Sequence, residues 1–178
     1  MKTISFPLKD EYPSYYGTYL GYVEKVTDIL AFAEAQIAEV RSLFGSLTAV
    51  QADFAYAEGK WSAKQLLGHL IDTEKIMLYR ALSFARGEQQ SLAGFDENAY
   101  VANGGFEKRS IADLLEDFEL GRRVYLKTIS SFGDHTFAHL GKANNYPMSV
   151  QAIAYMIPGH VAHHMAVYQT RYLPVLPR

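Results

Sequence analysis

Hydrophobic residues recur at intervals of three and four along most of the chain, which is the periodicity of amphipathic helices. This pattern predicts four long helical segments, at about residues 15–47, 63–86, 111–132 and 150–172. The first segment is either one long helix or two shorter helices joined near Lys25–Asp28. No stretch between the segments alternates with a period of two over enough residues to indicate a strand. The pattern therefore predicts an all-α fold, and specifically a four-helix bundle.

Sequence signals mark where these helices begin and end. Ser62 and Gln65 have the spacing of a capping box, and Gly87 can adopt the left-handed conformation that ends a helix. Ser110 can cap the third segment, and the fourth segment begins after Ser149.

The connection across residues 88–109 is longer than the 2–8 residues that usually join the helices of a bundle. It can cross the whole length of the molecule, so the second and third helices need not be antiparallel. A chain of 178 residues has the size of one domain, and no internal repeat or low-complexity tract divides it. We therefore expect a single domain over residues 1–178.

Composition excludes several classes of function. With 17 Lys and Arg against 19 Asp and Glu, the formal net charge of −2 gives no broad positive field to attract nucleic acid or anionic lipid. The apolar runs are far shorter than the roughly 20 residues that cross a bilayer, and no secretory signal is visible, so we expect a cytoplasmic protein. The chain has no Cys, which excludes thiolate metal sites and a cysteine nucleophile. Any metal or covalent chemistry must use nitrogen and oxygen groups.

Three of the six His residues lie close together in the fourth segment, as His160, His163 and His164. Residues four apart on a helix share a face, so two imidazoles at this spacing can bind one metal ion. The apolar stripe continues through His160 and His164. His163 aligns with a weaker face and is expected at the solvent or behind the ligands. A further candidate, His69, lies on the apolar stripe of the second segment.

The positions of these residues along their helices indicate how the helices pack. At 1.5 Å per residue, His69 lies about 10 Å from the start of its helix, and His160 and His164 lie about 12–18 Å from the end of theirs. These heights match if the second and fourth helices are antiparallel, which predicts a metal site of His69, His160 and His164. The alternative is that each is an ordinary hydrogen-bonded core residue. His135 and His139 also have a spacing of four, but they fall in a predicted loop and are expected at the surface.

Other polar residues nearby have two interpretations each. Asp72 either acts as a base or supports a ligand or a metal-bound water, or it lies on a solvated helix face. A solvated face is favoured for Glu74. Arg80, on the stripe of His69, meets either an anionic substrate group or an internal carboxylate. Pro158, inside the fourth helix, removes a hydrogen bond and predicts a kink one turn before the ligands.

Five short motifs together resemble the DinB-like family, particularly its YfiT-type branch of metal-dependent hydrolases. They are KWS at 60–62, GHLIDTE at 68–74, RALSFARG at 80–87, GFDENAY at 94–100 and GHVAHH at 159–164. The motifs occur in the same order as in the family, over about residues 12–173. One departure is Pro158, where relatives commonly have a small residue.

This resemblance implies a four-helix bundle with up-down-down-up topology and a zinc or nickel ion held by three His. On this chain those ligands fall on His69, His160 and His164, the same three that periodicity selects. The resemblance also implies a homodimer. Some relatives are thiol transferases that use bacillithiol or mycothiol.

Three functions are consistent with these features. Three imidazoles leave a coordination position open on a divalent ion, which lowers the pKa of bound water to near 7, so the first is a metal-dependent hydrolase of a small-molecule substrate. The second is a metal-dependent transferase that uses a low-molecular-weight thiol, such as a bacillithiol-like one. Because the chain has no Cys, that thiol would be a substrate. The third is a non-catalytic bundle in which the metal only stabilises the fold or a dimer.

Overall fold

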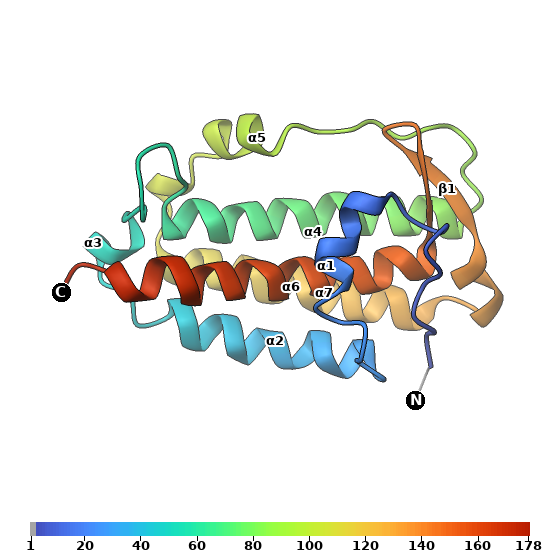
Figure 1. Ribbon diagram of the computed structural model, residues 1–178, viewed down its shortest axis with the longest axis horizontal. Coiled ribbons are helices and arrows are strands. Elements are labelled where there is room, and N and C mark those ends of the chain that lie inside the picture. The colour runs from blue at the N-terminus through green and yellow to red at the C-terminus, as the bar shows by residue number, and fades with distance from the viewer. Residues whose placement is uncertain (1–2) are drawn as a thin grey trace.

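The computed structural model describes residues 3–178, and its centre is a bundle of four long helices (Figure 1). They are α2 (Ile29–Phe44), α4 (Ala63–Ala85), α6 (Ile111–Ser131) and α7 (Val150–Val167). In chain order they run up, down, down and up, so α4 and α6 are parallel whereas α4 and α7 are antiparallel. Both α2 and α4 pack against α6 and α7. The predicted bundle and its topology are confirmed.

Shorter elements surround the bundle. They comprise α1 (Gly17–Leu20), α3 (Ala49–Ala52), α5 (Glu97–Asn103), 3-10 turns at Ser14–Tyr16, Phe106–Lys108, Asp134–Ala138 and Leu173–Val175, and a π-helical turn at Tyr168–Tyr172 that extends α7. The first predicted segment is therefore divided, as in the second of the two alternatives. Asp28 caps α2 by accepting a hydrogen bond from the backbone N–H of Ala31 (3.0 Å). Within residues 3–178, no helix is both long and apolar enough to cross a bilayer.

The helix ends follow the capping signals of the sequence. At the start of α4, Ser62 Oγ accepts from the backbone of Gln65 (3.2 Å), and Gln65 Oε1 accepts from the backbone of Ser62 (2.9 Å). Ser110 and Ser149 cap α6 and α7 by accepting from the backbone N–H groups of Asp113 and Ala152, without the reciprocal side-chain bond. Gly87, just beyond α4, has a φ of 85°, which a glycine adopts without steric cost.

The prediction that no strand is present is wrong for a short hairpin. Strand β1 (Leu140–Ala143) pairs antiparallel with β2 (Tyr146–Ser149), just before α7. The two-residue turn consists of Asn144 and Asn145, with φ values of 51° and 64°. Two successive left-handed residues are typical of a type I′ hairpin turn. Strands of four residues are too short to show a convincing alternating pattern, so this turn is the signal that the sequence offers.

The long connection after α4 crosses the molecule as expected. It leaves one end of the bundle, passes along the outside of α4, and returns through α5 to the other end, where α6 begins (Figure 1). The hairpin anchors its first part, because Leu92 donates its N–H to Lys142 O and accepts from Asn144 N–H, both at 2.9 Å. The connection is thus held beside α4, where it can cover a pocket.

A buried polar network joins all four bundle helices. The fully buried Arg122 of α6 donates to Glu74 of α4 (2.9 Å) and to Gln36 Oε1 of α2 (2.7 Å). Gln36 in turn donates to the Pro158 carbonyl of α7 (2.9 Å). The prediction of a solvated face for Glu74 is wrong, since this side chain is only 4% exposed. The guanidinium of Arg122 supplies the positive charge and the hydrogen bonds that water would otherwise provide.

Pro158 lies inside α7, which continues through it to Val167. Because proline has no N–H, the carbonyl oxygen of Ala154 one turn earlier loses its helical donor. The hydroxyl of Tyr125, from α6, donates to that oxygen at 2.6 Å. The core therefore contains a specific replacement for the missing hydrogen bond.

Replacing Tyr125 with Phe is expected to lower the free energy of unfolding by about 1–3 kcal/mol, because the buried Ala154 carbonyl then has no partner. The cost should be smaller in a Pro158→Ala background, where residue 158 regains the N–H that bonds this carbonyl. Urea denaturation of the two single variants and the double variant measures the coupling. Equal costs of Tyr125→Phe in both backgrounds would contradict this account.

Candidate metal centre

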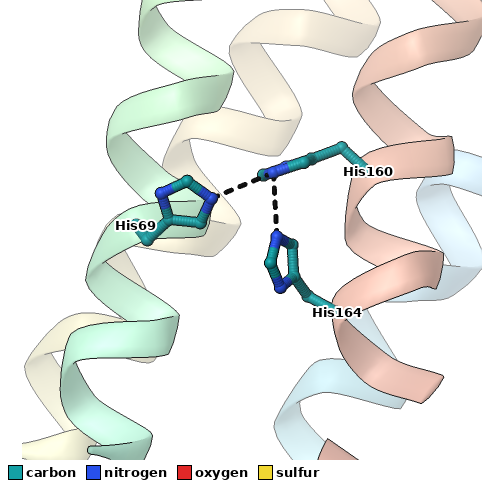
Figure 2. A group of neighbouring side chains, drawn as sticks. All are labelled: His69, His160 and His164. Atoms are coloured by element: carbon teal, nitrogen blue, oxygen red, sulfur yellow. Dashed lines mark hydrogen bonds between the residues drawn. The ribbon is translucent and has the colours of Figure 1, made fainter. Parts of the chain in front are cut away.

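Three imidazoles converge between α4 and α7 (Figure 2). His69 projects from α4, and His160 and His164 project from successive turns of α7. The Nε2 atom of His160 lies 3.0 Å from Nε2 of His69 and 3.0 Å from Nε2 of His164. The structure thus brings together the three His residues that helical periodicity selects, at the height that antiparallel packing predicts.

Close packing of α1 against α7 fixes one side of this cluster. A Cβ atom on Gly159 would lie 2.5 Å from the backbone oxygen of Tyr19, so this approach requires a glycine. The ring of Tyr19 then contacts His160, with the ring centroids 5.0 Å apart. On the other side, the Trp61 ring lies 4.6 Å from that of His69. Aromatic side chains therefore pack against two of the three imidazoles.

Burial keeps these imidazoles neutral. It lowers the pKa of His69 to about 4 and, with added repulsion from His69 and His163, the pKa of His164 to about 3. The pKa of His160 is lowered by burial first and then by its His neighbours. A neutral imidazole nitrogen without hydrogen offers a lone pair, which is the form that binds metal.

The contacts among the three nitrogens also fit a metal ion. In a neutral imidazole, a ring nitrogen either carries one hydrogen and donates it, or has one lone pair and accepts. Nε2 of His160 can therefore form a full hydrogen bond to only one of its two neighbouring nitrogens at a time. A cation between the nitrogens would accept all three lone pairs. Thr73 Oγ1 lies 3.5 Å from Nδ1 of His69, on the far side of the ring, where a partner orients a ligand. The donor set is therefore compatible with a divalent ion that prefers nitrogen.

The His cluster forms part of the wall of a pocket of about 380 Å³. One helical stripe of α4 lines it, from His69 through Thr73 and Met77 to Arg80. The crossing connection contributes Gly94, Phe95 and Glu97. Its aromatic walls are Tyr15, Tyr16, Tyr19, Trp61 and Phe95. A small molecule in this pocket could contact the imidazoles directly.

A sequence model of the DinB superfamily matches residues 31–167, which is more than half of the chain. The chain belongs to the DinB superfamily. Among solved structures, YfiT from Bacillus subtilis matches with a TM-score of 0.71 and 15% sequence identity, over 90% of this chain and 87% of YfiT. YfiT is described as a probable metal-dependent hydrolase with an unusual four-helix bundle topology. No curated protein sequence matches the chain.

Of the other candidates in this DinB-superfamily chain, His163 contacts the cluster, with its ring centroid 4.9 Å from that of His164, whereas Asp72 and His135 do not line the pocket of the cluster. His163 is half-buried and contacts the rings of Tyr19 and Tyr22 at 5.2 and 5.6 Å. Asp72 is not among the residues that line the His pocket, and instead lines a separate surface pocket beside α5. His135 is exposed, as expected.

The aromatic walls of the pocket are not among the residues that the sequence pattern identifies. Trp61 offers a signal, because it directly precedes the capping Ser62, where an apolar side chain often packs back on the first turn of the helix. Tyr19 offers none, since its position depends on how α1 folds back onto α7. Arg80 lies on the stripe of His69, as predicted, and its contacts with Ala93 and Phe95 are supplied by the connection between α4 and α6.

Acid is expected to destabilise the metal-free protein through these neutral imidazoles. Since the folded-state pKa of His69 is about 4 and the ordinary value is 6.5, the unfolded chain binds more protons between these values. Stability should therefore fall as the pH drops below about 6.5, by about 2 kcal/mol at pH 5 for His69 alone. Urea denaturation with a chelator at pH 7 and pH 5 measures this. A His69→Phe variant should lose less stability on acidification than the unaltered chain, and an equal loss would contradict the assignment.

Proposed function

We propose that this protein is a metal-dependent hydrolase of a small-molecule substrate, with a divalent ion, zinc or nickel, bound by His69, His160 and His164. The observation that carries the proposal is the convergence of three neutral Nε2 atoms on the wall of a pocket. A purely structural His cluster would not need to face such a pocket. The likeness to YfiT supports the same class of activity.

The side chains have distinct roles in this proposal. When bound, a divalent ion supplies Lewis acidity and lowers the pKa of a coordinated water. The three imidazoles bind the ion in their neutral form and leave part of its surroundings open to the pocket. Thr73 orients His69, and the rings of Tyr19 and Trp61 pack against His160 and His69. The aromatic walls of the pocket bind the apolar part of the substrate.

Hydrolysis of a panel of chromogenic esters, amides and lactones tests this function. Turnover by the protein loaded with zinc or nickel, its loss on chelation, and its return when the metal is restored would support it. Turnover should persist in the control variant His139→Ala, because His139 ends the 3-10 turn before β1 and does not line the pocket.

Other outcomes would replace the proposal. Metal-dependent turnover that occurs only when a low-molecular-weight thiol is added would indicate the transferase instead. A large fall in melting temperature on chelation, without turnover of any compound in the presence or absence of thiols, would indicate a metal that only stabilises the bundle.

A further inference from the structure

Three Lys or Arg side chains are buried within residues 3–178, and they differ in how their charge is balanced. Lys64 forms an ion pair with Asp53, at 2.9 Å, and Arg122 forms one with Glu74, also at 2.9 Å. Arg80, only 4% exposed, takes part in none of the ion pairs of the described residues. Burying an unpaired charge is costly, so this arrangement calls for an explanation.

The contacts of Arg80 orient its guanidinium without neutralising it. One Nη donates to the backbone oxygen of Ala93 (2.8 Å), and the other donates to the sulfur of Met77 (3.2 Å). The guanidinium carbon lies 5.8 Å from the centre of the Phe95 ring. These two hydrogen bonds occupy only two of the five N–H groups of a guanidinium, and both acceptors are uncharged. The connecting segment therefore holds the side chain in place and leaves donors and charge available.

Arg80 lines the same pocket as the three imidazoles. It lies eleven residues after His69 on α4, which corresponds to about 16 Å along the helix axis. Thr73 and Met77 line the pocket between them. A single small group cannot contact both ends, whereas an elongated molecule can.

The charges in the pocket restrict what that molecule carries. Arg80 is the only Lys or Arg among the described residues that line it. Glu97 is the only acidic residue lining it, and this exposed side chain is not paired with Arg80. At this end of the pocket, about 16 Å along α4 from His69 and its proposed metal ion, one unpaired cation matches a monoanion better than a doubly charged phosphate. The planar fork of a guanidinium also matches the two oxygens of a carboxylate.

We infer that Arg80 binds the carboxylate of an elongated, largely apolar substrate whose reacting group lies at the three His residues. The inference rests on the proposed function for the position of the reacting group. It adds the substrate class, namely an acid with a hydrolysable group at the end remote from its carboxylate. Arg80 is then a residue that determines specificity and positions the substrate.

Calorimetric titration of the zinc-loaded protein with monohydroxamates of linear dicarboxylic acids, from succinate to sebacate, tests this inference. The hydroxamate is a metal-binding group, and the free carboxylate reaches Arg80 once the chain is long enough. At that length the acid should bind more tightly than its methyl ester, and Arg80→Gln should weaken the acid about ten- to hundredfold while leaving the ester unchanged. Arg80→Lys, which keeps the charge but not the fork, should show an intermediate loss. The matched control is Arg123→Gln, because Arg123 is 60% exposed on α6 and remote from the pocket.

The outcomes separate this inference from the proposed function. An acid that binds no better than its ester at any length, or a preference that persists in Arg80→Gln, would overturn the role of Arg80. If the protein binds no zinc or nickel, the proposed function fails. The role of Arg80 is then tested in the metal-free protein with phenylbutyrate and its primary amide. A preference for the acid that Arg80→Gln removes would support the carboxylate site, and the absence of a preference would overturn it.

Discussion

Replacing Arg122 with Met is expected to lower the free energy of unfolding by about 3–5 kcal/mol, the largest effect on stability that the fold predicts. The change leaves the carboxylate of Glu74 buried without its partner and removes the donor to Gln36 Oε1. The main cost is the uncompensated charge in a core that water does not reach. Because the network joins all four helices, the loss should affect the whole bundle and not one helix end.

Urea denaturation measures this effect against a close control. The neighbouring residue Arg123 is 60% exposed and pairs with Glu119 on the surface, so Arg123→Met should change stability by no more than about 1 kcal/mol. Combining Arg122→Met with Glu74→Leu should recover much of the loss, because no buried charge then remains unpaired. Similar effects of Arg122→Met and Arg123→Met would show that the buried pair contributes little.

Replacing any one of His69, His160 and His164 with Ala is expected to weaken metal binding by about 3 kcal/mol, which is at least a hundredfold. This magnitude assumes that each ligand supplies about a quarter of the binding free energy of a four-ligand zinc site. The loss should be largest for His160, since its Nε2 contacts both other nitrogens. His163→Ala should retain the metal, because that ring packs against Tyr19 and Tyr22. This last variant is a demanding control, as His163 directly precedes a proposed ligand.

Competition titrations with a chromophoric chelator measure these affinities. They are best made with protein purified without an affinity tag, so that no additional His residues compete. Retention of wild-type affinity by all three Ala variants would contradict the ligand assignment. Loss of metal affinity in His163→Ala alone would indicate that the metal site lies on the other face of α7.

The sequence was sufficient to predict the bundle and the His cluster, because both depend on regular helical geometry. Once α7 is a helix, its apolar stripe distinguishes His164 from His163. Matching heights along α4 and α7 then indicate antiparallel packing. Capping residues such as Ser62 and Ser149 act locally, so the starts of α4 and α7 were also predictable.

Features that depend on contacts between distant elements were not predictable in the same way. Glu74 appears solvated when α4 is considered alone, and only the parallel packing of α6 brings Arg122 to it. The hairpin at residues 140–149 is too short for a periodic signal. Arg80 contacts Ala93 and Phe95, which belong to a connection without regular periodicity. Asp72 follows His69 closely in sequence, yet it lines a different pocket.

The most direct test of the central claim is a crystal structure of the protein grown with zinc or nickel, with anomalous diffraction recorded at the absorption edge of that metal. One strong anomalous peak is expected about 2.0–2.1 Å from the Nε2 atoms of His69, His160 and His164. The remaining coordination position is expected to face the pocket. No peak at these nitrogens, or a peak held by other residues such as His135 and His139, would contradict the central claim.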